Sequence, residues 1–156
     1  MEEENFEYVG FWLRLGAWLI DSLIFWIVAT PVLASVYGWR YFTDPDYPAV
    51  VGPTDIAVNW VFPAVATVVL WMIWQATPGK MAISARVVDA RTGMPARTIQ
   101  YVVRYLAYLL SALPFCLGFI WVGVDSRKRG WHDMLAGTVV VRPRDRRPEA
   151  VNFDRR

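Results

Sequence analysis

The sequence predicts an all-α polytopic membrane protein with two full transmembrane helices and a third, proline-broken membrane segment. Three observations support this fold class. Hydrophobic residues make up 56% of the 156-residue chain and charged residues only 19%, against about 25% charged in typical soluble domains. The apolar residues gather in three long blocks. The pieces between them fall short of the roughly 50 residues that a separate soluble domain needs, which excludes a soluble globular enzyme.

The first two apolar blocks each predict a complete membrane crossing. Residues 15–36 hold one charge in 22 residues, and residues 56–76 hold none in 21. A bilayer core about 30 Å thick is crossed by about 20 apolar residues in a helix. We expect the first helix to begin near Phe11, after an acidic leader unlike the basic start of a signal peptide. Thr77-Pro-Gly-Lys80 then ends the second helix with a turn, and Lys80 is expected to be a cytoplasmic anchor.

The third block, residues 101–124, holds one charge in 24 residues but is interrupted by Pro114 near its centre. Proline breaks the hydrogen-bond ladder of a helix and kinks or ends it. The block therefore predicts either a single tilted span or a hairpin, a re-entrant segment that returns to the side from which it entered. The charge distribution outside the blocks favours the hairpin.

The charges between the blocks predict the topology. Residues 37–55 carry a net charge of −2, whereas residues 77–100 carry +3 and residues 125–156 carry +4. Lys and Arg near the ends of spans stay preferentially in the cytoplasm. Both basic segments, and with them residues 1–8 and 142–156, are therefore predicted to be cytoplasmic, and residues 37–55 external.

Two short runs in the basic segments predict strands. Residues 83–88 and 138–141 are rich in β-branched side chains and are bounded by turn residues. On one side of the membrane they can pair as a short cytoplasmic two-stranded β ladder. The basic tail, residues 143–156, is expected to be flexible and drawn to anionic lipid. A net charge of +2 indicates no nucleic-acid partner.

Polar residues within the blocks are the candidates for function. Asp21 lies midway through the predicted first helix, where burying a carboxylate costs at least about 2.5 kcal/mol. Arg14 lies seven residues earlier on the same helix face, about 10 Å away along the axis. Either these two side chains reach toward each other, or both meet partners on other helices. Arg104 in the third block and Asp125 just after it are candidate partners.

Two interpretations of these charges stay open. Asp21 is a titrating site that binds a proton or a cation, or Arg14, Asp21 and Arg104 form a buried ionic clasp that sets helix order. Farther on, His132 and Asp133 are expected to form an imidazole–carboxylate pair that tunes the histidine near neutral pH. One cysteine and one histidine exclude an intrachain disulfide and multi-Cys or His-cluster metal sites, and no cofactor is indicated.

Four motifs, in this order along residues 8–142, resemble the RDD family of bacterial integral membrane proteins, which is named for one Arg and two Asp. They are Gly10-Phe-Trp-Leu-Arg14-Leu-Gly-Ala-Trp-Leu-Ile-Asp21, Thr77-Pro-Gly-Lys80, Val87-Val-Asp89 with Gly93, and Trp131-His-Asp133-Met-Leu-Ala-Gly-Thr138-Val-Val. By position, Arg14 and Asp21 correspond to the family's Arg and first Asp. Either Asp125 or Asp133 corresponds to the second.

The resemblance implies a single membrane domain over residues 1–156 with a core at 8–142, in the bacterial cytoplasmic (inner) membrane. It also makes ion or small-solute transport a hypothesis, because at least one relative is described as a sodium–proton antiporter. Cation–proton exchange would need a homo-oligomer, since two to four membrane segments cannot readily enclose a pathway. The ion-site candidates are then Arg14, Asp21, Arg104, Asp125 and Asp133, supported by Lys80 and His132. The alternative is a non-catalytic scaffold or accessory subunit that binds another membrane protein.

Overall fold

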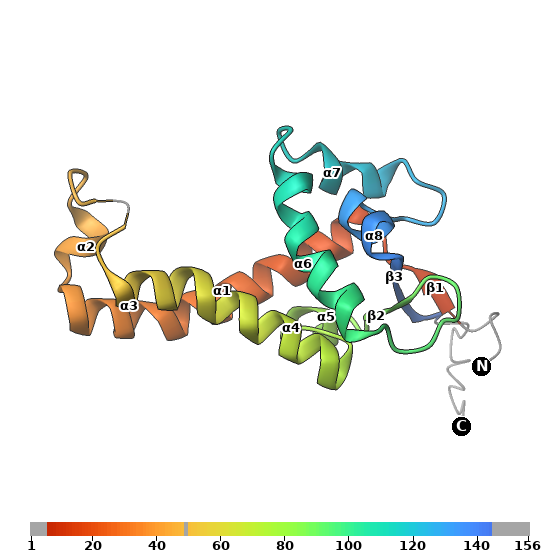
Figure 1. The fold of residues 1–156 in the computed structure, drawn as a ribbon, viewed down its shortest axis with the longest axis horizontal. Helices are drawn as coiled ribbons and strands as arrows, with labels where there is room; N and C mark the ends of the chain where they lie inside the picture. The colour runs from red at the N-terminus through yellow and green to blue at the C-terminus, as the bar shows by residue number, and fades with distance from the viewer. Residues whose placement is uncertain (1–5, 49, 145–156) are drawn as a thin grey trace, which may run out of the picture.

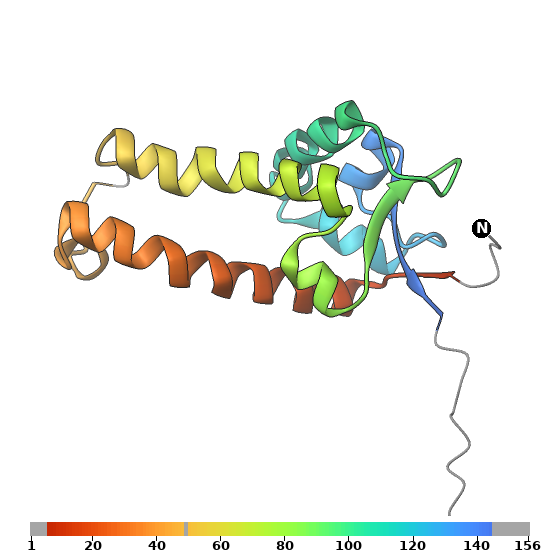
Figure 2. The same cartoon turned by 90° about the horizontal axis from the view of Figure 1, so that it is seen from below.

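The computed structural model describes residues 6–48 and 50–144 and is mostly helical, with a small antiparallel sheet at one end (Figure 1). Two helical segments are long and apolar enough to cross a membrane. The first is α1 (Phe11–Tyr37), and the second is Pro53–Trp74. They run antiparallel and are joined by residues 38–52 (Figure 2). These segments confirm the two long apolar helices that the sequence predicts.

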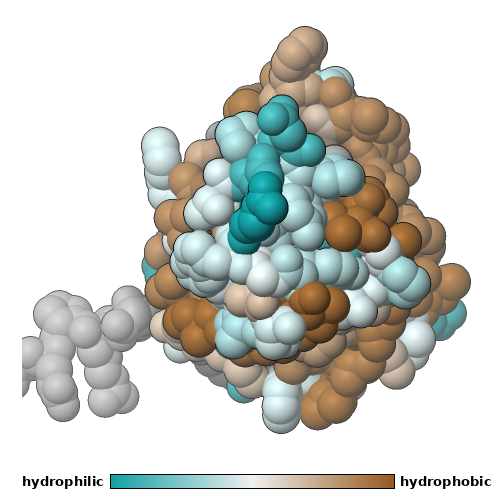
Figure 3. Space-filling model, turned by 90° about the vertical axis from the view of Figure 1, so that its left-hand side faces the viewer, coloured by the Kyte–Doolittle hydropathy of each residue, from teal (hydrophilic) through white to brown (hydrophobic). Residues whose placement is uncertain are grey.

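The first long helix begins at Phe11, as expected. Its 27 residues give a length of about 40 Å at about 1.5 Å per residue, more than a bilayer core requires. Gly38, with a φ of 75°, ends it, because glycine adopts this left-handed backbone without steric cost. The short helix α2 (Arg40–Thr43) follows. Figure 3 looks onto this end of the molecule, where hydrophilic side chains form a band beside hydrophobic ones.

The second long segment is built from three pieces. It runs from α3 (Pro53–Ile56) through a π-helical turn (Ala57–Val61) into α4 (Phe62–Trp74). Pro53 begins α3, where the first turn needs no amide donor. Pro63, the second residue of α4, directly follows the π-helical turn, which interrupts the α-helical hydrogen-bond pattern at that point. After α4, the short helix α5 (Pro78–Ala82) returns to pack against α1.

The third apolar block is broken where the sequence predicts. Helix α6 (Thr98–Ala112) is followed by α7 (Leu117–Ile120) and a 3₁₀ turn (Trp121–Gly123), and the two parts are bent by 114°. Pro114 lies in the break. The 15 residues of α6 reach only about 22 Å, less than the thickness of a bilayer core. This block is therefore not one straight span.

The sheet has the strand order β1-β3-β2, with β1 at Phe6–Tyr8, β2 at Arg86–Asp89 and β3 at Thr138–Pro143. Both pairs are antiparallel, and Val87 lies opposite Val140. The predicted pairing of the two β-branched runs is confirmed. The strand predicted at residues 83–88 is β2. It begins at Arg86 rather than at residue 83, because Ser84 turns the chain with a φ of 55°. The pairing of β1 was not predicted.

The core lies between the sheet and the helices. Trp71 of α4 and Tyr101 of α6 pack there with buried aliphatic side chains that are far apart in the sequence: Val9, Ala85, Val87, Ala96 and Val140. Helix α8 (Trp131–Ala136) packs against α6 and leads into β3. The sheet thus gathers residues 6–8, 86–89 and 138–143 at the end of the molecule opposite the 38–52 connection (Figure 2).

Candidate functional site

The buried charges meet in an ionic cluster that consists of Arg14, Arg104 and Asp133. Arg14 Nη1 donates a hydrogen bond to Asp133 Oδ2 at 2.5 Å, and Arg104 Nη1 donates to Asp133 Oδ1. The side chains of Asp133, Arg104 and Arg14 are 0%, 1% and 13% exposed. One carboxylate therefore forms ion pairs with two guanidinium groups, and all three side chains have little exposure to solvent.

The three members of the ionic cluster come from three different helices, and each makes further hydrogen bonds. Arg14, on the first turn of α1, also donates to the carbonyl oxygens of Val9 (2.9 Å) and Lys128 (2.5 Å). Arg104 of α6 donates to Thr138 Oγ1 at 2.8 Å. Asp133 lies in the first turn of α8 and accepts the amide N–H of Gly130 at 3.0 Å. The cluster therefore ties α1, α6 and α8 together.

The electrostatics of the cluster keep Asp133 ionised. Burial raises the pKa of Asp133, but the guanidinium groups of Arg104 and Arg14 outweigh it and hold that pKa well below its usual range. For His132 the effect of burial is larger than that of Asp133. Burial lowers the pKa of His132 to about 3, although the Asp133 carboxylate opposes the shift. His132 Nε2 lies 3.6 Å from Asp133 Oδ2. The two side chains lie together as predicted, but the predicted tuning near neutral pH is wrong, because desolvation of the imidazole outweighs the attraction of a carboxylate that two arginines already share.

Ser111, His132 and Asp133 form a row that resembles a catalytic triad in connectivity but not in setting. His132 Nδ1 lies 3.2 Å from Ser111 Oγ, and all three side chains are buried. The hydroxyl of Ser111 also lies 3.0 Å from the carbonyl oxygen of Ala107 and donates to it. A base with a pKa of about 3 is poorly matched to proton abstraction near neutral pH. The row fits a role in packing α6 against α8.

Asp21 has different partners. Its carboxylate accepts the hydroxyl of Thr77 at 2.5 Å and the amide N–H of Gly79 at 2.7 Å. It therefore binds the start of α5 rather than Arg14. The sequence left two arrangements open, and the second is observed. Arg14 and Asp21 do not contact each other, and each meets a partner on another element. The predicted clasp of Arg14, Asp21 and Arg104 is corrected in one member, since the shared carboxylate belongs to Asp133.

Lys80 and Asp125 form no ion pair with the members of the ionic cluster. Lys80 is half-buried, with Nζ 5.7 Å from the centre of the Trp71 ring, and burial lowers its pKa. Asp125 instead pairs with Arg129 at 3.1 Å, and this contact lowers the pKa of Asp125. Within residues 6–48 and 50–144, no group of three or more His, Cys, Asp or Glu residues is placed to hold a metal ion.

A second polar network, which the sequence did not reveal, lies at the opposite end. Asp55 is 1% exposed and accepts hydrogen bonds from the hydroxyl of Tyr41 (2.5 Å) and from Asn59 Nδ2 (2.7 Å). The amide N–H of Asp55 donates to the hydroxyl of Tyr37 at 3.1 Å. The network joins the end of α1 to the start of the second long segment. The i, i+4 spacing of Asp55 and Asn59 was the available signal.

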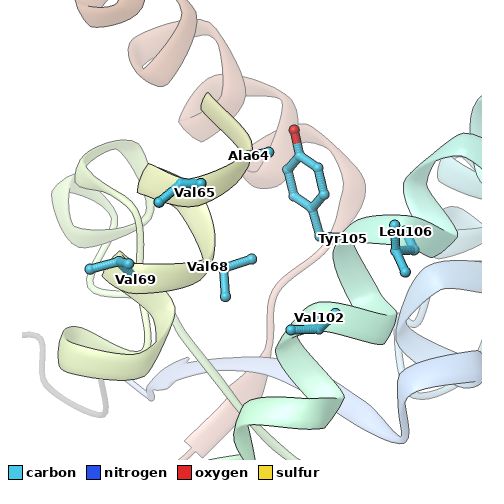
Figure 4. Close-up of a pocket in the computed structure, with 7 residues that line it drawn as sticks. All are labelled: Ala64, Val65, Val68, Val69, Val102, Tyr105 and Leu106. Atoms are coloured by element: carbon cyan, nitrogen blue, oxygen red, sulfur yellow. The ribbon is translucent and has the colours of Figure 1, made fainter. Parts of the chain in front are cut away.

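An apolar groove, hereafter the α4/α6 groove, lies between these two helices. Its volume is about 310 Å³. Figure 4 shows Val68 and Tyr105 facing each other across it from the two helices. The lining residues are Ala64, Val65, Val68, Val69, Val102, Tyr105 and Leu106.

Comparisons with known proteins agree with the motifs. The chain is 29% identical over 146 residues to an uncharacterized protein, YxaI, of Bacillus subtilis, covering 85% of this chain and 95% of the relative. It is 28% identical over 141 residues to the uncharacterized YckC of the same organism, covering 85% and 83%. No solved structure matches the chain. The model of the RDD family matches residues 8–137, and the chain therefore belongs to the RDD family.

Proposed function

We propose that this protein is a non-catalytic accessory or scaffold subunit that acts by binding another membrane protein. The observation that supports the proposal is the α4/α6 groove, which is open and lined by apolar side chains. Its α4 wall consists of Ala64, Val65, Val68 and Val69. Helices in a bilayer associate by van der Waals packing, so this concave apolar wall suits a transmembrane helix of a partner. The charges of the ionic cluster, by contrast, are engaged with one another.

Photocrosslinking in the membrane tests this proposal. A photoreactive phenylalanine at Val65, in the groove, is expected to give one discrete adduct with a partner protein, because the groove holds the partner's helix in place. Position 27 of α1 provides the matched control, since Ile27 is 65% exposed and Val65 is 56% exposed. Equal yields of the same adducts from both positions, or adducts with lipid alone, would contradict the role of the groove.

A second candidate function is cation–proton exchange by a homo-oligomer, with Asp21 as the titrating group. One observation favours it: Asp21 is held by the neutral donors of Thr77 and Gly79. Among the described residues, no cationic side-chain nitrogen lies within 4.0 Å of its carboxylate. A cation that binds Asp21 therefore has no arginine to displace, whereas Asp133 is held by two arginines. In this mechanism Arg14, Arg104 and Asp133 hold the fold.

Flux measurements separate the two candidates. In vesicles that contain the purified protein, Asp21→Asn is expected to abolish proton-coupled sodium flux if Asp21 is the exchanging group. The amide of asparagine neither gains nor loses a proton near neutral pH. Asp125→Asn serves as the control, since Asp125 pairs with Arg129 elsewhere. Undiminished flux in a folded Asp21→Asn protein would remove Asp21 from the mechanism. No flux in the wild type would leave the accessory role.

We also propose that the chain crosses the cytoplasmic membrane twice, with both ends of the described chain in the cytoplasm. Three features support this topology. The strands β1, β2 and β3 lie together at one end of the molecule, α6 is shorter than a bilayer core, and the segments beside the sheet are basic. Helices α6 and α7 then enter the cytoplasmic leaflet and return. The exposed apolar side chains of Leu113, Phe115 and Val124 are placed to contact lipid there.

Cysteine labelling in whole cells tests the hairpin. In a Cys116→Ser background, new cysteines at Met94 and Arg127 flank the third block, and one at Pro48 lies in the 38–52 connection. A reagent that cannot cross the membrane is expected to label position 48 in intact cells and positions 94 and 127 only after the cells are opened. Labelling of position 127 from outside would show that the third block crosses the membrane.

A further inference from the structure

The indole of Trp71 lies among hydrogen-bond donors that have no acceptor. Trp71 and Arg104 are 0% and 1% exposed. Their Nε1 and Nε atoms have no hydrogen-bond partner within the part of the chain that the structure describes. Protein interiors rarely leave a buried N–H unpaired, because the group loses water and gains nothing in return. Two such donors on neighbouring side chains therefore indicate that an acceptor belongs here.

Two cations lie against the same ring. Arg104 Cζ is 5.2 Å and Lys80 Nζ is 5.7 Å from the centre of the Trp71 ring. The ammonium group of Lys80 can donate three hydrogen bonds. Among the described residues it has one contact, at 3.4 Å, with Thr77 Oγ1 and no carboxylate within 4.0 Å. Lys80 therefore adds unused donors to those of Trp71 and Arg104.

The carboxylates in this part of the molecule are already engaged. Asp133 is shared by Arg14 and Arg104, and Asp21 accepts from Thr77 and Gly79. Three cations, Arg14, Lys80 and Arg104, thus face two carboxylates. These five groups carry a net charge of +1, so the region lacks one negative charge and, for the two unpaired N–H groups, an acceptor.

We propose that Trp71, Lys80 and Arg104 form a binding site for a small inorganic anion of the size of chloride, hereafter the Trp71 site. An anion accepts from every side and donates nothing, which matches the N–H donors of Trp71, Lys80 and Arg104. A water molecule would bring two hydrogens of its own that need acceptors. Burial of Trp71 and Arg104 favours a monatomic ion over phosphate or sulfate, and half-buried Lys80 provides the route of entry.

The Trp71 site brings together residues of three helices. Trp71 ends α4 and Arg104 belongs to α6, while Lys80 comes from α5. Tyr108 of α6 also borders it, with its ring 5.9 Å from that of Trp71. A bound anion would hold these three helices together by attraction to two of them and a hydrogen bond from the third. Chloride binding is therefore expected to raise thermal stability.

The experiment measures the melting temperature of the detergent-purified protein while sodium chloride replaces sodium gluconate at constant ionic strength. For the wild type we expect a saturable rise. In Lys80→Met the chloride concentration at half-effect should increase at least about tenfold, since a charge-assisted hydrogen bond is lost. Trp71→Phe keeps a ring and removes one donor, so a smaller increase is expected. Lys128→Met removes a lysine elsewhere, whose Nζ contacts only the carbonyl oxygen of Gly123 in the described chain, and should behave as the wild type.

The outcomes are decisive even if Lys80→Met fails to fold. In that case, broadening of the ³⁵Cl resonance by the wild-type protein, its reversal by bromide, and its reduction in Trp71→Phe would support the site. A chloride response that is absent in the wild type, or equal in the wild type and Trp71→Phe, would overturn it and assign the donors to water. Neither result bears on the α4/α6 groove, whose crosslinking test is independent.

Discussion

Asp133→Asn is expected to lower the free energy of unfolding by about 3–5 kcal/mol, the largest effect of any single substitution proposed for this chain. The change keeps the size of the side chain but removes its charge. Arg14 and Arg104 then share no carboxylate, and Arg104 is 1% exposed. A buried guanidinium cannot neutralise itself by losing a proton, so the fold carries the full cost of an unpaired charge.

Thermal and denaturant unfolding in detergent would measure this effect. Asp125→Asn is the matched control, because the Asp125–Arg129 pair is partly exposed (13% and 26%) and such pairs contribute less than about 1 kcal/mol. A second change, Arg104→Met in the Asp133→Asn background, should recover part of the loss by removing the stranded charge. Equal stability of Asp133→Asn and Asp125→Asn would show that the ionic cluster does not hold the fold.

Gly79→Ala is expected to be the second most damaging change, with a loss of at least about 2 kcal/mol. A Cβ atom on Gly79 would lie 1.9 Å from the carbonyl oxygen of Ala17 and 3.0 Å from Asp21 Cγ. Neither the backbone of α1 nor that of α5 can yield locally. Helix α5 would therefore move away from α1 and break the hydrogen bonds from Gly79 and Thr77 to Asp21.

Gly16→Ala, in the facing helix α1, provides the opposite expectation. A Cβ atom at Gly16 meets nothing within 4 Å, and alanine favours helix over glycine by about 0.5–1 kcal/mol. This variant should therefore be as stable as the wild type or more stable, whereas Gly79→Ala melts earlier in the same detergent. If the two variants melt together, the close approach of α5 to α1 is not a determinant of stability.

The features that the sequence predicted are those with a local cause. The length and apolar character of α1 and of Pro53–Trp74 depend only on neighbouring residues, and the break at Pro114 follows from the proline itself. The pairing of β2 with β3 was predictable because both runs carry β-branched side chains and basic flanks. The strand β1 was not, because three residues of mixed polarity at Phe6–Tyr8 carry no period that marks a strand.

The partners of the buried charges depend on the whole fold and could not be predicted from spacing. Arg14 and Asp21 share a helix face, yet Arg14 reaches Asp133 across 119 positions of the sequence. The motif resemblance left Asp125 and Asp133 equivalent. Only the position of α8 against α6 separates them, since it brings Asp133 to Arg104 and leaves Asp125 with Arg129.

The separation of Arg14 from Asp133 has a consequence for biosynthesis. A ribosome that adds about 5–20 residues per second needs roughly 6–24 s to make the 119 positions between them. During that time α1 has left the ribosome, while the carboxylate that neutralises its arginine does not yet exist. The central strand β3 is also made last, so the sheet closes only at the end of translation. The nascent chain therefore passes through a period in which water or lipid headgroups, rather than Asp133, solvate Arg14.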